Sequence, residues 1–129
     1  MVLADTSIWI NFFNLPDSAE KHAVDSLIDA DNIAITGVVL TEILQGCRGK
    51  KDFATVKELL LALPWLETTQ SVWIKAGEIT SALLRRGITL PIPDLILAAT
   101  AMEYKCQLFS LDRHFEKIPG LDRLNPSSP

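Results

Sequence analysis

The sequence predicts an α/β fold, in which a mainly parallel sheet carries helices on both faces. Short apolar segments typical of buried strands alternate with longer segments whose apolar residues recur at helical spacing. This alternation favours parallel strands joined by crossover helices. The length of 129 residues fits one domain. We expect this domain to span 1–124 and a short disordered tail, "NPSSP", to occupy 125–129.

The strands are predicted from short apolar runs. "VLAD" is the first of these, "IAIT" and "WLET" follow, and "QLFS" lies near the end, with "LDRL" as a fifth candidate. The predicted strands therefore lie at 2–5, 33–36, 65–68, 107–110 and 121–124. In open parallel sheets the ligand crevice lies beyond the carboxyl ends of the strands.

The helices are predicted from apolar stripes and from residues typical of helix ends. At 17–30, Asp17 is the expected N-cap, with Glu20 three residues later as in a capping box. A helix at 37–47 is expected to end near Gly46 or Gly49. A third helix is expected at 53–63. Its apolar face comprises Phe53, Val56, Leu59, Leu60 and Leu63.

Two further helices complete the expected fold. One covers 71–87, with Arg85 and Arg86 in its last turn before Gly87. Its apolar face comprises Val72, Ala76, Ile79 and Leu83. The other covers 93–105 and has Pro93 near its start, where proline is tolerated.

Composition limits the class of protein. Apolar residues make up 48% and charged residues 22%, which is ordinary for a soluble globular protein. The longest apolar run, "LLLALPWL", is too short to span a bilayer, and the N-terminus lacks the basic region of a signal peptide. Cys47 and Cys106 show no metal-binding spacing. We therefore expect reduced thiols and a cytoplasmic protein.

Four acidic residues stand out because their neighbours are apolar or uncharged. Asp5 closes the first predicted strand, and Asp112 follows the strand at 107–110 by two residues. Glu42 and Asp94 lie in apolar helices without Lys or Arg at helical spacing. An ionised carboxylate in apolar surroundings is costly unless a cation, a helix N-terminus or a metal compensates it.

Each acid taken alone also has a structural explanation. Asp5 can cap a following helix through the amides near Ile8, and Asp94 suits the first turn of a helix. Glu42 fits a solvated helix face, and Asp112 fits a surface loop. Taken together, converging carboxylates repel one another and require a cation. Oxygen donors without His or Cys suit Mg²⁺ or Mn²⁺, whereas zinc would need His and Cys at ligand spacing.

The charge balance fits this interpretation. Twelve Lys and Arg against sixteen Asp and Glu give a net charge of −4, which at first argues against a nucleic-acid partner. Sixteen acids less these four leaves twelve, which balances the basic residues. Bound divalent cations would therefore offset the whole excess, and a polyanionic substrate remains compatible with the sequence.

At this point the sequence resembles a known family. The segments "LADTSIWI", "LTEILQG", "PIPDLILAATA" and "LFSLDRHF" occur in this order along essentially the whole chain, with eighteen residues from Asp94 to Asp112. They are similar to PIN-domain nucleases, and most closely to the VapC toxins of bacterial and archaeal toxin–antitoxin pairs. The resemblance implies a three-layer α/β/α sandwich on a short parallel sheet.

The resemblance also implies an activity and its residues. It implies a metal-dependent endoribonuclease that hydrolyses RNA phosphodiester bonds and is inhibited by a VapB-like antitoxin. Asp5, Glu42, Asp94 and Asp112 would be the catalytic acids that hold Mg²⁺ or Mn²⁺. Thr6 and Ser110 would supply hydroxyls beside the metal. A homodimer and a hetero-oligomer with the antitoxin are further implications, with no membrane partner.

Several other residues are candidates for contact with RNA. Arg48, Lys50, Arg85 and Arg113 suit this role, although solvated surface charge and helix-end cations also explain them. His114 either contacts RNA or is an exposed surface residue. Three aromatic residues either stack bases or, as we expect from their apolar segment, fill the core or a dimer interface. They are Trp9, Phe12 and Phe13.

Rival functions make different demands on the sequence. A haloacid-dehalogenase-like phosphatase needs a second Asp two residues after Asp5, where this chain has Ser7. A phosphate-accepting receiver needs an adjacent acidic pair after its first strand, which this chain lacks. A binding module whose acids only dock a basic tail would survive metal removal, whereas a metal-dependent nuclease would not.

Overall fold

The computed structural model describes residues 1–124, so the predicted disordered tail at 125–129 lies outside the described residues. The chain forms a four-stranded parallel sheet in the order β3-β2-β1-β4. The strands are β1 (Val2–Ala4), β2 (Ile33–Thr36), β3 (Trp65–Leu66) and β4 (Gln107–Phe109). All four coincide with predicted strands, and the sequence-based prediction of a parallel α/β fold is confirmed.

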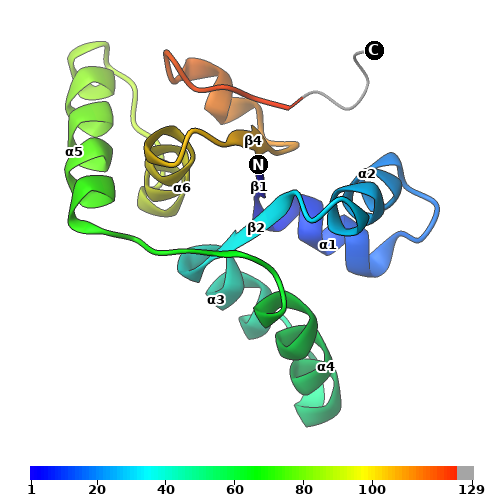
Figure 1. The fold of residues 1–129 in the computed structure, drawn as a ribbon. Coiled ribbons are helices and arrows are strands. Elements are labelled where there is room, and N and C mark those ends of the chain that lie inside the picture. The colour runs from blue at the N-terminus through cyan, green and yellow to red at the C-terminus, as the bar shows by residue number, and fades with distance from the viewer. Residues whose placement is uncertain (125–129) are drawn as a thin grey trace.

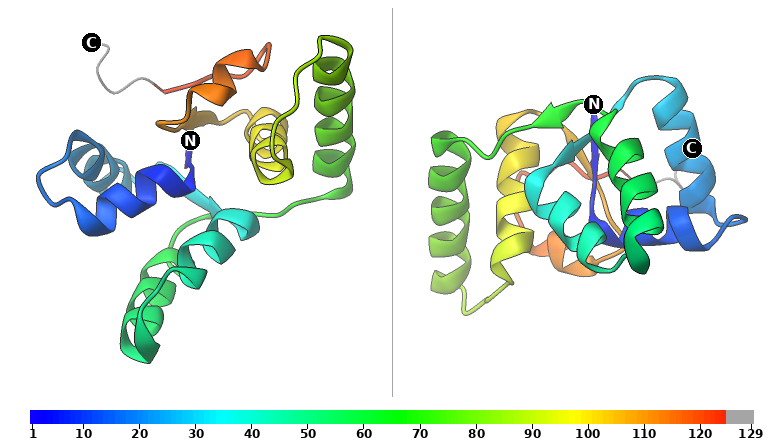
Figure 2. Two further views of the ribbon diagram at one scale, coloured as in Figure 1. Left: turned by 180° about the vertical axis from the view of Figure 1, so that it is seen from behind. Right: turned by 90° about the horizontal axis from the view of Figure 1, so that it is seen from below.

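Helices cover both faces of this sheet. They are α1 (Thr6–Asn14), α2 (Ala19–Asp29), α3 (Gly37–Gln45), α4 (Gly49–Leu61), α5 (Gln70–Arg85), α6 (Ile92–Glu103) and the 3₁₀ helix η1 (Arg113–Lys117). Figure 1 shows α5 and α6 on one side of the sheet and α1 and α2 on the other, with α3 and α4 below them. Both views in Figure 2 show α5 packed alongside α6. The layers are those of a three-layer α/β/α sandwich.

The pairing of β1 with its neighbours brings two chain segments to the same edge. Leu3 lies opposite Ala34 of β2 and Leu108 of β4, and Ala4 lies opposite Phe109. All strands run in the same direction, so the residues after β1 and β4 emerge side by side at the carboxyl edge. This register places Asp5 next to Ser110.

The core consists of both strand faces and the apolar stripes of the helices. The strands of the sheet's centre are buried on both faces, as expected for a parallel sheet between helix layers. Trp9 is fully buried and Phe12 is 9% exposed, and their rings pack edge to face with centroids 5.3 Å apart. Phe13 is partly buried against the same cluster. These aromatic side chains fill the core, as expected.

The apolar faces predicted for two helices can be compared with the structure. In α5 all four predicted positions are buried: Val72, Ala76, Ile79 and Leu83. In α4 Val56 and Leu60 are buried, but Phe53 is 41% exposed, so the prediction for that side chain is wrong. The helix begins at Gly49, four residues before the predicted start, where a φ of 77° suits glycine.

Two other details of the prediction are wrong. The N-cap of α2 is Ser18, whose hydroxyl accepts a hydrogen bond from the Lys21 amide at 3.1 Å, and Asp17 lies one residue too early. The segment 121–124 forms no strand within the described chain. It contributes an isolated bridge between Arg123 and Leu108. Within residues 1–124, no helix combines the length and apolar character needed to cross a membrane.

Candidate active site

Asp5 is fixed by the end of β1 and the start of α1. Its amide donates a hydrogen bond to the Phe109 carbonyl at 2.9 Å and so extends the pairing of β1 with β4. Its side chain is the N-cap of α1, where Oδ1 accepts a hydrogen bond from the Ile8 amide at 3.2 Å. The expected capping role is therefore confirmed. Only 7% of the residue is exposed to solvent.

Two hydroxyls tie Asp5 to the segment that follows β4. Ser7 Oγ donates to Asp5 Oδ1 at 2.5 Å, and Ser110 Oγ donates to Asp5 Oδ2. Each hydroxyl oxygen also accepts a backbone amide from the next loop: Leu111 N at 3.3 Å and Asp112 N at 2.9 Å, respectively. The position of Asp112 is thus coupled to that of Asp5.

Burial and these hydrogen bonds shift the pKa of the Asp5 carboxyl in opposite directions. Burial has the larger effect and raises the pKa of the Asp5 carboxyl above its ordinary value of 3.8, while the hydrogen bonds from Ser110, Ser7 and Ile8 lower it. A carboxylate offers roughly four lone-pair positions on its two oxygens. Among residues 1–124, Ser7 Oγ and Ile8 N donate to Oδ1 and Ser110 Oγ donates to Oδ2, which leaves Oδ2 a lone-pair position for a cation.

Glu42 approaches Asp5 from a different element. It lies in α3, which follows β2, and its side chain is partly buried. Thr6 Oγ1, from the first turn of α1, donates a hydrogen bond to Glu42 Oε1 at 2.9 Å. The hydroxyl of Thr6 therefore holds Glu42 toward the start of α1, beside the residue that caps this helix.

Asp94 joins the same cluster from α6. This helix is buried from Leu95 to Ala101, and Asp94 lies in its first turn at the partly exposed end. Burial is the largest cause that raises the pKa of the Asp94 carboxyl, followed by the negative charges of Asp112, Asp5 and Glu42. The other three acids are therefore close enough for their charges to act on Asp94.

Asp112 brings a histidine into the site. Asp112 caps η1, and its Oδ1 accepts a hydrogen bond from the His114 amide at 2.9 Å. The ring Nδ1 of His114 lies 3.2 Å from the same oxygen. One donor atom from each of Asp94, Asp112 and His114 lies within 4.8 Å of the others. A ring nitrogen therefore lies beside the carboxylate oxygens that the sequence predicts as metal ligands.

Of the ten predicted site residues, the structure brings the four acids and the two hydroxyl residues together. Across the described residues, the four basic residues are not paired with them. The four acids converge at the carboxyl edge, and the hydroxyls of Thr6 and Ser110 hold two of them. The basic candidates Arg48, Lys50, Arg85 and Arg113 are exposed. Within residues 1–124 none of these four forms an ion pair with the acids of the cluster.

Sequence reasoning missed Ser7 as a partner of Asp5, and it weighed His114 only as an RNA contact or an exposed residue, not as a neighbour of the acids. Ser7 follows Asp5 by two positions, and His114 follows Asp112 by two positions. This spacing is the signal that could have found them, because a helix start lets the side chain two residues after the cap fold back over it.

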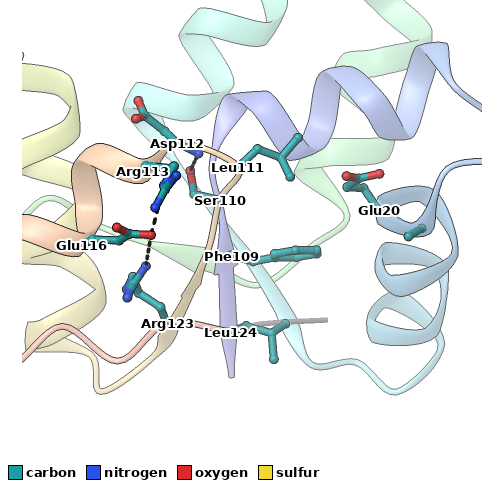
Figure 3. Close-up of a pocket in the computed structure, with 10 residues that line it drawn as sticks. Glu20, Phe109, Ser110, Leu111, Asp112, Arg113, Glu116, Arg123 and Leu124 are labelled. Carbon is teal, nitrogen blue, oxygen red and sulfur yellow. Dashed lines mark hydrogen bonds and ion pairs between the residues drawn. The ribbon is translucent and has the colours of Figure 1, made fainter. Parts of the chain in front are cut away.

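A cavity of about 520 Å³ opens beside Asp112 (Figure 3). Ser110, Asp112 and Arg113 line it on the side of the cluster, and Arg123 lines it farther along β4. Arg113 Nε and Arg123 Nη1 lie 3.5 Å and 3.7 Å from the same oxygen of Glu116. Two guanidinium groups share one carboxylate here, next to the acidic cluster.

The donors of the cluster fit a divalent cation. The carboxylates that raise the pKa of Asp94 come from separate elements, and within the described chain no Lys or Arg is paired with any of them. Carboxylate oxygens are the ligands that Mg²⁺ and Mn²⁺ favour.

The fold and this acidic edge define the class of the protein, an α/β/α nuclease. The family model of the PIN domain matches residues 2–121. Ribonuclease VapC21 of Mycobacterium tuberculosis is 31% identical over 108 residues, which cover 81% of this chain and 78% of that protein. A Ribonuclease VapC of Rickettsia bellii is 32% identical over 134 residues, covering 95% and 94%.

The chain belongs to the PIN-domain family, within the group of VapC ribonucleases. A solved structure, VapBC2 of Rickettsia felis bound to a DNA fragment of the promoter, has the same fold with a TM-score of 0.83. It is 23% identical in sequence, and the match covers 97% of this chain and 98% of that one.

Proposed function

We propose that this ribonuclease is a metal-dependent endonuclease that acts as the toxin of a toxin–antitoxin pair and hydrolyses phosphodiester bonds of RNA. The observation that carries the proposal is the convergence of Asp5, Glu42, Asp94 and Asp112 at one edge of the sheet without a paired Lys or Arg in the described chain. Repulsion among these acids supports a bound Mg²⁺ or Mn²⁺ as their counter-charge.

The acids would hold the metal, and their neighbours would hold the acids. A metal bound there would lower the pKa of its bound water and would stabilise negative charge on the phosphate oxygens. Asp5 and Asp94 are the primary ligands in this proposal, and Asp112 completes the set. Glu42 either contributes a further ligand or orients the attacking water through its second carboxylate oxygen, since Thr6 already occupies Oε1. Attack by water leaves 5′-phosphate and 3′-hydroxyl ends.

Basic residues around the carboxyl edge would hold the RNA backbone. Arg48 and Lys50 lie at the start of α4, close to a groove that Glu42 borders. Arg85 ends α5, whose following loop leads into the helix that carries Asp94. Arg113 lines the cavity beside Asp112. We propose phosphate contacts for these four side chains, and such contacts weaken as salt concentration rises.

A VapB-like antitoxin is the proposed inhibitor. A groove of about 310 Å³ lies between α1, α3 and α4 and is lined by Ile10, Phe13, Ile43 and Val56, with Glu42 on its border. An apolar segment that ends in a basic side chain would fill the groove and place its charge against the acids. This arrangement would block cleavage by occupying the position of the metal and substrate.

Self-association through α5 and α6 is also proposed. Large apolar side chains are exposed there, namely Trp73 at 54%, Leu84 at 55% and Ile92 at 61%. The small residues Ala76 and Gly77 form a hollow between them. A second copy offers both the projecting side chains and the hollow to receive them, so the face is self-complementary.

The apolar face can be tested with a matched pair of variants. Leu84→Glu would yield monomers in analytical ultracentrifugation of the antitoxin-free protein. Leu61→Glu, at a position 53% exposed on α4, would leave the dimer intact. Dimers of both variants would contradict this part of the proposal.

An RNA cleavage assay on the purified, antitoxin-free protein tests the catalytic proposal. We expect discrete cuts with Mg²⁺ or Mn²⁺, no cuts with chelator, and no cuts by Asp5→Asn. Sequencing of the 5′ ends would give the cleavage site. If the folded wild type leaves total cellular RNA intact in the presence of either metal, the nuclease proposal fails. The acids would then serve only as a docking surface for a basic tail.

A further inference from the structure

His114 lies at the open side of the acid cluster. It is in the first turn of η1, and its side chain is 53% exposed. The backbone and the ring both approach Asp112 Oδ1, at 2.9 Å and 3.2 Å. One nitrogen of the ring and one carboxylate oxygen each of Asp94 and Asp112 lie within 4.8 Å of one another. The imidazole therefore faces the carboxylates of both residues.

The contact with Asp112 identifies the ring nitrogen that faces the cluster. His114 Nδ1 lies 3.2 Å from Asp112 Oδ1, a separation that allows both atoms to bind one ion. In the neutral imidazole protonated at Nε2, Nδ1 keeps its lone pair for a metal. Asp112 and His114 would thus offer an oxygen and a nitrogen to the same ion.

We propose that His114 is a nitrogen ligand of the metal held by Asp94 and Asp112, and that it makes the site prefer Mn²⁺ to Mg²⁺. The inference rests on the proposed function in one respect, namely that the acids hold a metal. Its geometric basis is the set of donor atoms from Asp94, Asp112 and His114 within 4.8 Å of one another. Mg²⁺ favours oxygen ligands in a strict octahedron, whereas transition metals accept imidazole readily.

The chain provides a matched control because its other histidine, His22, is exposed on α2. Untagged full-length protein, stripped of metal and loaded with Mn²⁺, would be measured by pulsed electron paramagnetic resonance. We expect ¹⁴N coupling to Mn²⁺ in the wild type and in His22→Ala, and its loss in His114→Ala. Only direct coordination by a nitrogen gives this coupling, so a ring that merely steadies Asp112 would not produce it.

Affinities give a second measurement that does not depend on cleavage. We expect His114→Ala to weaken Mn²⁺ binding by about tenfold and to leave Mg²⁺ binding, measured by competition, nearly unchanged. His22→Ala should match the wild type for both ions. Circular dichroism would verify that each variant is folded, which we expect because both side chains are exposed.

Two results would overturn the inference in different ways. Mn²⁺ bound with equal affinity by all three proteins and without ¹⁴N coupling would remove His114 from the metal site while the proposed nuclease stands. Failure of every protein to bind Mn²⁺, together with absence of metal-dependent cleavage, would refute the proposed function itself.

Discussion

The acid cluster has two halves that the chain supports differently. Asp5 and Glu42, the clamped acids, receive hydrogen bonds from hydroxyls: Ser7 and Ser110 donate to Asp5, and Thr6 donates to Glu42. Asp94 and Asp112, the open acids, lack such donors among residues 1–124. Asp94 has no side-chain hydrogen bond there, and Asp112 contacts only His114, two residues away, through its carboxylate.

This difference separates two ways of positioning a carboxylate. The clamped acids are oriented by the fold before any ion binds, because their donors come from other elements or from a helix start. Of the open acids, Asp94 accepts no hydrogen bond among residues 1–124, and Asp112 is held only by His114 at the start of η1. We infer that the clamped acids define where the metal sits and that the open acids close around it.

The largest expected effect comes from replacing a clamped acid. Asp5→Asn should lower the rate of RNA cleavage about a thousandfold, or about 4 kcal/mol in activation free energy, because a primary metal ligand is lost. The measurement is single-turnover cleavage with saturating Mg²⁺ or Mn²⁺. Asp17→Asn, on an exposed loop, is the control and should retain full activity. Cleavage by Asp5→Asn at the wild-type rate would remove Asp5 from the metal site.

The second prediction tests whether Ser110 couples the clamped acids to the open acids. Its hydroxyl donates to Asp5 and accepts from the Asp112 amide, so Ser110→Ala disturbs a clamped and an open acid together. We expect cleavage to fall by about 10- to 100-fold, the usual effect of losing a group that orients a metal ligand. Ser71→Ala, at the exposed start of α5, is the matched control. Equal rates for both variants would mean that Asp5 keeps its orientation without this clamp.

A smaller effect is expected at Thr6. Thr6→Val keeps the shape of the side chain but removes the donor to Glu42 Oε1. Cleavage should fall about tenfold because Glu42 then samples other orientations. Thr41→Val serves as the comparison, since the Thr41 hydroxyl only bonds the Gly37 carbonyl of its own helix. A loss as large as that of Asp5→Asn would show that Thr6 itself contacts the metal or the substrate.

The smallest expected effect is a change in thermal stability on replacing the open acid Asp94. The raised pKa of Asp94 means that the folded chain binds a proton at this carboxyl more tightly than the unfolded chain does. Stability contributed by the protonated form is therefore lost as pH rises above the ordinary value of 3.8. In chelator, Asp94→Asn should melt a few degrees above the wild type at neutral pH.

The pH dependence of Tm tests this prediction further. The difference in Tm between Asp94→Asn and the wild type should shrink as pH falls toward 3.8, because Asp94 then becomes neutral like the Asn that replaces it. Added Mn²⁺ should reverse the order at neutral pH, because only the wild type keeps the full set of ligands. A variant that melts below the wild type in chelator would mean that Asp94 has a stabilising partner in the metal-free protein.

Local pattern was sufficient for most of the fold. The strand at 33–36 and the apolar face of α5 were predictable because period and burial coincide in these segments. The predicted cap at Asp17 was wrong because Ser18, one residue later, offers an equally good acceptor, and sequence pattern does not distinguish adjacent caps. The candidate strand at 121–124 has the right residues but meets the edge strand at a single bridge.

The acids themselves were visible in the sequence, but their supports were not. An uncompensated carboxylate in an apolar segment is a local signal, and it singled out Asp5, Glu42, Asp94 and Asp112. The contact of Ser110 with Asp5 joins residues that are 105 positions apart, and only the parallel pairing of β1 with β4 creates it. His114 entered the cluster because η1 turns its ring back toward the residue that caps it.

The sequence by itself determined the alternation of strands and helices, the buried faces and the placement of acids at strand ends and in apolar helices, because each depends on neighbours within a few residues. Tertiary structure decided which acids are clamped, which remain open and which nitrogen joins them. Those outcomes depend on the register of two parallel strands and on the direction of side chains from separate elements. The contacts of Thr6 with Glu42 and of Ser110 with Asp5 join residues that no local pattern connects, and they form only when the sheet and its helices pack.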